Sequence, residues 1–310
     1  MISVDQINKT FDQVKAVEDL SFKISQGEIV GLLGPNGAGK TTTMRIMSGF
    51  LAPDKGDVVV DGTSVVKDSI KVQAMLGYLP ENNPMYMDML VCDFLRFSGE
   101  LRGLSKKSLA EGIDFAVKGV HLEDVFYRPI KELSKGFKQR VGIAAALLHK
   151  PKVLIMDEPT EGLDPIQRNE IRGLIKELAK EHTIIISTHV MQEVEAVCTR
   201  MIIIDKGKLV VDGSVQELSK GKGDQIIFNV VIEGKDVEKG LKSLPEAQIE
   251  IVSIEDEKVT AKVKTQKDNA IQGEISKMAN DKKWVIWNIS QEVRQLEDIF
   301  RELTSSETTV

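Results

Sequence analysis

A glycine-rich loop is the feature that most restricts how this chain can fold. Residues 34–41 read GPNGAGKT and match the pattern G-x-x-x-x-G-K-[ST] at every fixed position. The loop follows an apolar run, Glu28–Leu33, and precedes Thr41–Gly49, which has a helical composition and ends in glycine. A strand, a tight turn and a helix in this order direct successive backbone N–H groups toward a phosphate. The sequence therefore predicts a phosphate-binding loop in an α/β domain.

Each residue type in the loop suits such a site. The glycines let the backbone curl around the β-phosphate, and the Lys40 ammonium can reach the β- and γ-phosphates. The Thr41 hydroxyl can ligate Mg²⁺. We therefore expect ATP and Mg²⁺ as ligands. The loop residues predicted to bind the nucleotide are Gly34, Pro35, Asn36, Gly37, Ala38, Gly39, Lys40, Thr41 and Thr42.

Length and composition limit the remaining possibilities. A chain of 310 residues is long enough for about two domains. Its 41 basic and 47 acidic residues give a net charge of −6, which argues against nucleic acid as the main partner. Two cysteines without metal or disulfide spacing fit a reducing compartment. The first residues do not have the pattern of a leader peptide, and no apolar run approaches the ~18 residues needed to cross a bilayer. We therefore expect a cytosolic chain with at most a peripheral membrane role.

The first 218 residues alternate short β-rich runs with amphipathic segments, a pattern typical of an α/β domain. Continuous apolar runs predict strands that are buried on both faces. They lie at Ile29–Leu33, Val153–Met156, Thr183–Ser187 and Met201–Ile204. Apolar residues at helical spacing predict an inserted helical lobe over residues 86–140. A polar stretch at 219–224 predicts a linker.

The remaining residues, 225–310, predict a small accessory domain. The expected elements are a strand at Gln225–Glu233, a helix at Asp236–Leu244, a hairpin of Ile249–Ile254 with Val259–Val263, a helix at Asp268–Ala279, a strand at Trp284–Ile289 and a last helix at Gln291–Leu303. The order β-α-β-β-α-β indicates a split βαβ fold. The residues leave open whether this domain is a structural or dimerising appendage or a ligand sensor.

An acidic pair ends one of the predicted strands. Residues 152–159 read KVLIMDEP, so Asp157 and Glu158 follow the apolar run directly. Asp157 is expected to hold Mg²⁺, and Glu158 to orient the attacking water of a nucleotide hydrolase. The alternative is an ordinary acid pair in a strand-to-turn junction. The phosphate loop upstream favours the functional interpretation, because a divalent cation between the acids and the phosphates offsets their repulsion.

Two further features suit phosphate binding. His189 follows the apolar run Ile184–Ile186 closely, at the strand edge where parallel sheets bind ligands. It can reach a γ-phosphate there, although a structural role is also compatible with a strand-end histidine. Ser134 is placed to cap a helix that runs through Leu148, and the N-terminus of that helix is a second anion site. The simpler alternative is that Ser134 only caps the helix.

These motifs, taken in order, resemble those of the ATP-binding subunits of ABC transporters. The resemblance covers residues 1–218. Its motifs are a Walker A loop at Gly34–Thr42, a signature motif at Leu133–Phe137, a Walker B strand at Val153–Glu158, a D-loop at Gly162–Pro165 and a switch histidine at His189. The resemblance implies a P-loop nucleotide-binding domain with a mixed sheet and an inserted helical lobe.

The same resemblance implies how ATP is bound and cleaved. Members of the family pair head to tail, so a homodimer is expected with each ATP between two copies. One copy supplies the Walker A loop, the catalytic residues Lys40, Glu158 and His189, and the adenine-stacking Phe11. The other supplies signature and D-loop residues, here Ser134, Gly136 and Asp164.

Some positions depart from the commonest family pattern. Lys135 and Phe137 replace glycine and glutamine in the signature motif, as in ABC-2 type exporters. Glu81 stands where the Q-loop glutamine is usual; its carboxylate can ligate Mg²⁺ but cannot donate a hydrogen bond when ionised. Segments 77–89 and 187–194 resemble the gliding-associated and drug-export branch, and 296–303 resembles its C-terminal extension.

The resemblance implies an ATPase that cleaves ATP to ADP and phosphate and powers export through a separate integral-membrane permease of the ABC-2 type. ATP-driven dimerisation would do the mechanical work at the inner face of the cell membrane. Two alternatives stay open. One is a soluble ABC-type ATPase acting on ribosomes or DNA, which the single Walker A motif and the acidic balance disfavour. The other is a regulatory ATPase, not coupled to transport, in which residues 225–310 sense a ligand.

Overall fold

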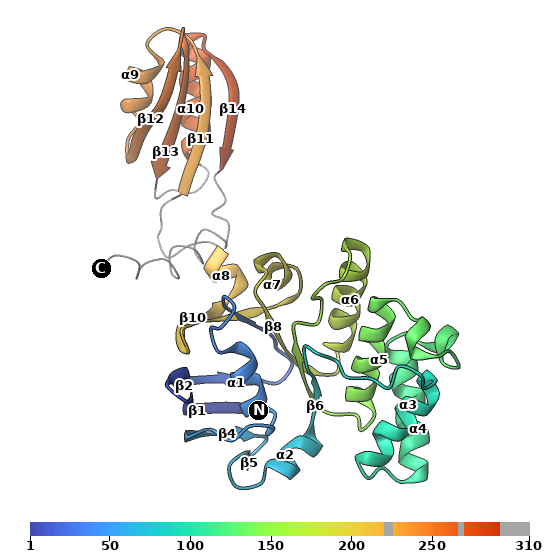
Figure 1. Cartoon of the computed structure of the whole chain (residues 1–310). Coiled ribbons are helices and arrows are strands. Elements are labelled where there is room, and N and C mark those ends of the chain that lie inside the picture. The colour runs from blue at the N-terminus through green and yellow to red at the C-terminus, as the bar shows by residue number, and fades with distance from the viewer. Residues whose placement is uncertain (220–225, 266–269, 292–310) are drawn as a thin grey trace. The chain divides into compact units, whose positions relative to one another are not determined.

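The computed structural model describes residues 1–219, 226–265 and 270–291. The chain divides after Val215 into two compact units, and each unit has a hydrophobic core of its own. The predicted boundary at residue 218 falls within a short helix, α8 (Val215–Ser219). The first unit is α/β, as the alternation of its sequence predicts (Figure 1).

A six-stranded mixed sheet forms the centre of the first unit. In the order of the sheet its strands are β10 (Lys208–Ser214), β9 (Arg200–Asp205), β3 (Ile29–Leu33), β8 (Thr183–Thr188), β7 (Val153–Asp157) and β6 (Leu76–Leu79). All neighbours are parallel except β10 and β9. Every residue of β3, β7 and β8 is buried, which confirms the strands predicted from continuous apolar runs.

A second, four-stranded antiparallel sheet lies beside the first and was not anticipated from the sequence. Its strands are, in sheet order, β2 (Val14–Ile24), β1 (Ile2–Phe11), β4 (Lys55–Val60) and β5 (Thr63–Ser64). The pairing of β1 with β2 contains register shifts, and Gln6 and Asp19 have positive φ. These irregularities interrupt the period-two alternation that reveals a half-buried strand in a sequence.

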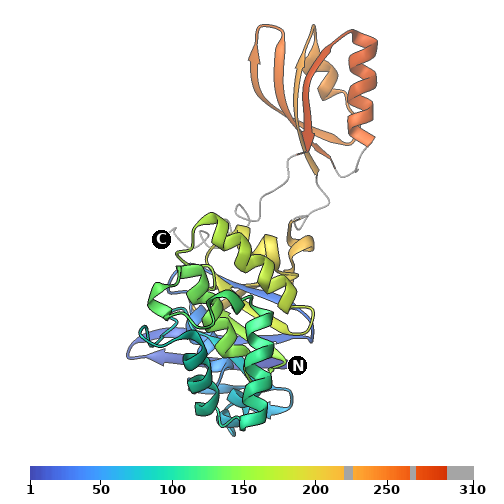
Figure 2. The same ribbon diagram turned by 90° about the vertical axis from the view of Figure 1, so that its right-hand side faces the viewer.

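Helices surround the central sheet, and Figures 1 and 2 show α3, α4 and α5 lying together as a helical lobe. The helices are α1 (Lys40–Met47), α2 (Ser69–Met75), α3 (Val91–Leu101), α4 (Lys106–Gly119), α5 (Lys135–Leu147), α6 (Pro165–Leu178) and α7 (Met191–Val197), with 3₁₀ turns at Glu123–Val125 and Ile130–Glu132. Helix α5 extends beyond residue 140, where the predicted lobe ends. It packs there against the sheet, since a Cβ on Gly77 would lie 2.4 Å from the Ala146 carbonyl oxygen.

The second unit is a four-stranded antiparallel sheet with two helices packed on one face (Figure 2). Along the chain it contains β11 (Ile226–Glu233), α9 (Val237–Lys242), β12 (Ala247–Glu255), β13 (Lys258–Thr265), α10 (Ala270–Lys282) and β14 (Val285–Gln291). This order confirms the predicted β-α-β-β-α-β sequence of elements, and the sheet order is β12-β13-β11-β14.

Three expectations fall wholly or partly outside the described residues. They are the linker after Ser219, the first residues of the helix predicted from Asp268, and the last helix beyond Gln291, a residue that itself ends β14. Within the described ranges, no helix is both long and apolar enough to cross a lipid bilayer.

Candidate nucleotide-binding site

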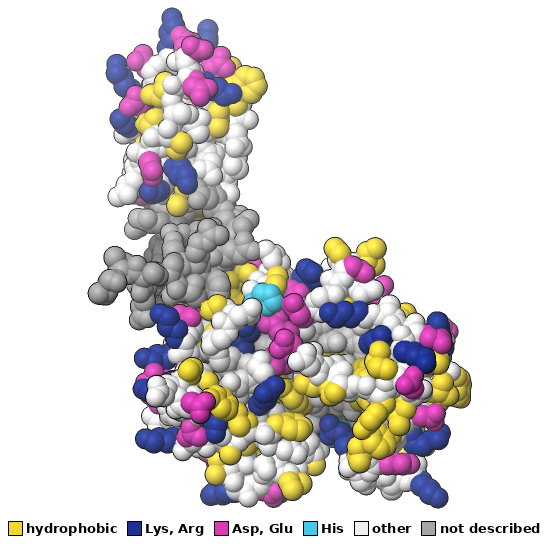
Figure 3. Space-filling model, viewed as in Figure 1, with side chains coloured by type: hydrophobic (Ala, Val, Ile, Leu, Met, Phe, Trp, Pro, Cys, Tyr) yellow, Lys and Arg dark blue, Asp and Glu magenta, His cyan; other side chains and the backbone are white. Residues whose placement is uncertain are grey.

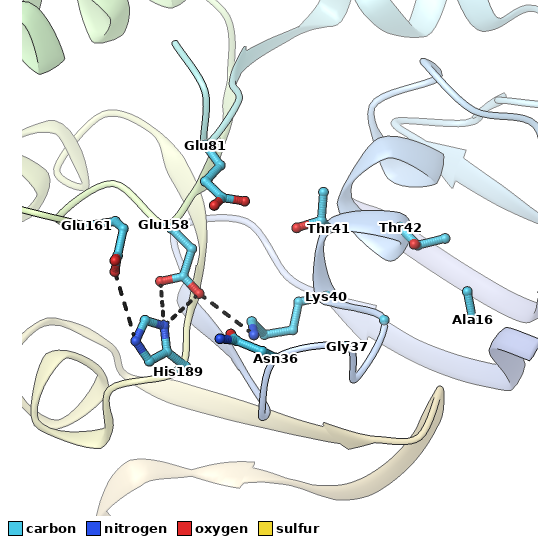
Figure 4. Close-up of a pocket in the computed structure, with 11 residues that line it drawn as sticks. Ala16, Asn36, Gly37, Lys40, Thr41, Thr42, Glu81, Glu158, Glu161 and His189 are labelled. Atoms are coloured by element: carbon cyan, nitrogen blue, oxygen red, sulfur yellow. Dashed lines mark hydrogen bonds and ion pairs between the residues drawn. The ribbon is translucent and has the colours of Figure 1, made fainter. Parts of the chain in front are cut away.

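The carboxyl ends of three adjacent parallel strands bring the predicted site together. The loop after β3, Glu158 at the end of β7 and the histidine after β8 surround a cavity of about 450 Å³ (Figure 4). This is the edge at which parallel α/β sheets bind ligands. The predicted residues that line the cavity are Asn36, Gly37, Gly39, Lys40, Thr41, Thr42, Glu81, Glu158 and His189.

The glycines of the loop serve different physical needs. A Cβ on Gly34 would lie 2.3 Å from the Ile204 carbonyl oxygen, and one on Gly39 would lie 2.3 Å from that of Ala16. Both positions therefore exclude a side chain because of backbone packing. Gly37 has open space around it but a φ of 82°, which favours glycine for conformational reasons. The loop then enters α1, whose first N–H groups have no side-chain cap.

Lys40 is held at the centre of this loop. Its side chain is buried, and the ammonium donates to the carbonyl oxygens of Gly34 at 2.8 Å and Pro35 at 3.2 Å. Its Nζ also lies 3.7 Å from Glu158 Oε1 (Figure 4). Among the described residues Glu158 is the one acidic partner of this buried cation, and the first N–H groups of α1 have no side-chain cap. Both features make the cavity favourable for a polyanion.

Glu158 occupies a strained position at the end of β7. Its φ is 48°, and its N–H donates to the Ser187 hydroxyl at 2.9 Å. Non-glycine residues adopt this backbone conformation rarely, and they do so preferentially at functional sites. Burial raises the pKa of the Glu158 carboxyl, while His189 and Lys40 oppose that rise. The His189 Nδ1 lies 3.1 Å from Oε1 and 3.2 Å from Oε2 of this carboxylate.

The sequence did not reveal two residues that line the cavity. Ala16 lies in β2, and its peptide backbone approaches Gly39. Glu161 follows the acidic pair, and its Oε2 lies 3.9 Å from His189 Nε2 (Figure 4). The imidazole therefore lies between two carboxylates. No sequence pattern gives the direction of a side chain after a turn. Only the spacing of Glu161 from Glu158 could have suggested that Glu161 lines the cavity.

Asp157 is fully buried beside the cavity. Its Oδ1 accepts a hydrogen bond from the Ser187 hydroxyl, whereas Oδ2 has no hydrogen-bond partner among the residues that the structure describes. Thr41 and Glu81 present oxygen atoms to the adjoining cavity (Figure 4). An unpaired buried carboxylate oxygen with a hydroxyl and a second carboxylate nearby is a hard-oxygen set that suits Mg²⁺.

Comparison with known proteins supports one family. Residues 17–161 match the ABC transporter family. The uncharacterised ABC transporter ATP-binding protein MJ1023 of Methanocaldococcus jannaschii is 40% identical over 220 residues, which cover 71% of this chain and 79% of that protein. This chain belongs to the ABC transporter family.

Two other similar members of the ABC family are informative. The bacitracin transport ATP-binding protein BcrA of Bacillus licheniformis is 36% identical over 239 residues, covering 76% of this chain and 77% of that protein. The structure of cbiO1 from Clostridium perfringens, part of the ABC transporter complex cbiONQ, superposes with a TM-score of 0.65 at 31% identity over 71% of this chain and 91% of that chain. The first unit therefore has the fold of an ABC ATP-binding subunit.

The remaining predicted residues of this ABC subunit do not line the cavity. Phe11 ends β1 and is 47% exposed, with the Lys9 ammonium 5.8 Å from its ring centroid. Ser134 caps α5 by accepting from the Phe137 N–H at 3.3 Å, and Asp164 caps α6 by accepting from the Gln167 N–H at 2.9 Å. A Cβ on Gly136 would lie 3.2 Å from Gln167 Cγ, so the first turns of α5 and α6 are in contact.

Proposed function

We propose that this ABC subunit binds Mg-ATP between two copies of itself, hydrolyses it and powers export through a separate integral-membrane permease. The observation that carries the proposal is the convergence of Lys40, Glu158 and His189 on one cavity, with Asp157 buried next to it. A phosphate loop, an acidic pair and a histidine at adjacent strand ends constitute a site for phosphoryl transfer to water.

The side chains divide the work of that reaction. The Lys40 ammonium and the first N–H groups of α1 hold the phosphates. Glu158 orients the attacking water and accepts its proton, and His189 holds the Glu158 carboxylate and contacts the γ-phosphate. Thr41, Asp157 and Glu81 would hold Mg²⁺. When bound, Mg²⁺ would neutralise charge on the β- and γ-phosphate oxygens.

We propose that the second copy completes the site. Ser134, Gly136 and Asp164 gather at the adjoining first turns of α5 and α6, away from the cavity of their own chain. Two neighbouring helix N-termini favour an anion. A head-to-tail homodimer would place this surface over the nucleotide of the partner, with Phe11 of the nucleotide-holding copy stacked on adenine.

A second hollow suits the permease. It has a volume of about 710 Å³, lies between the helical lobe and the sheet, and includes Phe50, Tyr78, Pro80 and Leu101 in its lining. Figure 3 shows hydrophobic side chains gathered on this face next to α3. The loop after β6 borders the hollow through Pro80 and Asn83 and reaches the ATP cavity through Glu81.

We propose that a cytosolic segment of an ABC-2 type permease docks in this hollow, which would hold the subunit at the inner face of the membrane. The similarity to BcrA supports this export branch.

Two substitutions test the proposal. Glu158→Gln should bind Mg-ATP, fail to hydrolyse it and accumulate as a dimer, whereas Lys40→Ala should bind ATP poorly. We would measure mass by size-exclusion chromatography with light scattering, and phosphate release for the parent and both variants. Parental phosphate release by Glu158→Gln would contradict the assigned role. A parent that stays monomeric and does not hydrolyse ATP would favour the regulatory alternative.

A further inference from the structure

Tyr78 lies where the apolar hollow and the predicted metal carboxylate meet. Strand β6 pairs with β7 in parallel, with Tyr78 opposite Ile155. Because side chains alternate along a strand, Tyr78, Ile155 and Asp157 point to the same face of the sheet. Tyr78 also lines the hollow, where its ring centroid lies 5.3 Å from that of Phe50. One side chain therefore faces both the hollow and the acidic end of β7.

The Tyr78 hydroxyl can donate a hydrogen bond, and the Asp157 carboxylate can accept one. The Tyr78 hydroxyl and Asp157 Oδ2 are both buried, and neither has a hydrogen-bond partner within the described part of the chain. Burial, then the charge of Asp157, raises the pKa of the phenol to about 12, while Arg45 opposes the rise. The phenol therefore keeps its proton at neutral pH and can serve as a donor to a carboxylate. Buried polar groups without partners are uncommon in native proteins, and a bound ligand is one explanation for them.

We propose that Tyr78 is a positioning residue for the metal site. In the metal-loaded subunit its hydroxyl donates to the Asp157 carboxylate and fixes the orientation in which that carboxylate meets Mg²⁺. The Ser187 hydroxyl already holds the other oxygen. Since the Tyr78 ring packs on Phe50 in the hollow, packing there sets the position of the hydroxyl. This inference rests on the proposed Mg-ATP function and adds a physical connection between the permease hollow and the metal.

The test measures metal binding without turnover. In the full chain carrying Glu158→Gln, Mn²⁺ binding in the presence of ATP would be followed by electron paramagnetic resonance. Tyr78→Phe removes only the hydroxyl and should weaken Mn²⁺ binding by about 10-fold, the usual cost of losing a partner that orients a metal ligand. ATP affinity in EDTA should not change. The matched control is Tyr86→Phe, because Tyr86 is exposed and packs edge-on against Phe97.

A double-mutant cycle tests the connection to the hollow. Phe50→Ala should weaken Mn²⁺ binding when Tyr78 is present and have no further effect in the Tyr78→Phe background. Unchanged Mn²⁺ affinity in Tyr78→Phe would overturn the inference, as would an equal loss of ATP affinity in EDTA, which would indicate a packing role. Additive effects of the two substitutions would remove the connection to Phe50. Failure of the Glu158→Gln chain itself to bind Mn-ATP would instead overturn the proposed function.

Discussion

At the scale of single residues, backbone packing and backbone conformation restrict which residues the phosphate loop can contain. Gly39 combines a φ of 101° with the approach of the Ala16 carbonyl, so any side chain would both strain and displace the loop. Gly37 has only the conformational restriction, because within the described residues, its two chain neighbours aside, nothing lies within 4 Å of its ideal Cβ. The two glycines therefore allow the steric contribution to be separated from the conformational one.

Gly39→Ala should destabilise the first unit clearly more than Gly37→Ala. Gly37→Ala introduces backbone strain alone and should lower the unfolding free energy by about 1–2 kcal/mol, the penalty of a left-handed backbone for an alanine. Gly39→Ala adds a collision of the new methyl group with the Ala16 carbonyl oxygen. We therefore expect a larger loss of unfolding free energy than for Gly37→Ala, together with weak ATP binding. Urea unfolding of the two variants and the parent measures the difference. Equal destabilisation would show that the Ala16 carbonyl moves freely.

His149 supplies a pH-dependent contribution to stability. Its Nε2 donates to the Leu76 carbonyl oxygen at 3.0 Å. Burial, aided by the charge of Arg102, lowers the pKa of His149 from 6.5 to about 4. The unfolded chain binds a proton at His149 more readily than the folded chain does. The stabilisation that neutral His149 gives to the folded chain is therefore complete above pH 6.5 and is lost as the pH falls toward 4. We expect His149→Gln to reduce the acid-dependent loss of unfolding free energy by about 2 kcal/mol, after allowance for partial exposure. Urea unfolding of the parent and of His149→Gln from pH 7.5 to 4.5 measures this difference. Parallel curves of unfolding free energy against pH would show that His149 is not the group responsible.

At the scale of elements, helix N-termini carry two kinds of role. Ser105 caps α4 by accepting from the Ser108 N–H, and Ser134 caps α5 in the same way from Phe137. The two caps are alike in chemistry, but the second lies at the α5–α6 contact, within the surface that we propose for the nucleotide of the partner. Capping by itself therefore does not identify a site.

Ser105→Ala and Ser134→Ala should each lower the unfolding free energy by about 1 kcal/mol through loss of a cap. Only Ser134→Ala should also weaken the ATP-dependent dimer, because we propose that its hydroxyl and helix end meet the nucleotide of the second copy. Thermal unfolding gives the first quantity, and light scattering of both variants in the Glu158→Gln background gives the second. Equal dimerisation of the two would reduce Ser134 to a structural cap.

At the scale of the whole molecule, the two units have separate cores. The core of the second unit includes Phe228, Val230 and Ile232 from β11, with both helices packed over them. The core of the first unit includes side chains of both its sheets and of α1. The two clusters share no residue, so substitutions in one core should leave the packing of the other unchanged.

Phe228→Ala should destabilise the second unit by about 3–5 kcal/mol, the usual cost of truncating a buried phenylalanine. Phosphate release measured at a temperature at which the first unit is folded should not change. Calorimetry that resolves the two unfolding transitions, together with an ATPase assay, checks both statements. Loss of ATPase activity would show that the second unit contributes to catalysis, which would favour the regulatory alternative for residues 225–310.

The sequence by itself determined the glycine-rich loop and the position of the buried strands. Fixed spacing specified the phosphate loop, since a tight turn between strand and helix requires particular residues at particular positions. Continuous apolar runs specified β3, β7 and β8, because strands buried on both faces tolerate few polar side chains. The β1–β2–β4 sheet was missed, because its bulges break the alternation on which such predictions depend.

Only the tertiary structure decided which residues meet. Glu161 reaches His189 through a turn, Ala16 reaches Gly39 from another sheet, and Tyr78 shares a sheet face with Asp157 through the β6–β7 register. Ser134 and Asp164 cap two helices whose first turns are in contact, and neither residue lines the cavity of its own chain. These proximities follow from strand order, register and helix packing. Local sequence does not encode them, because a motif specifies its own backbone but not its neighbours.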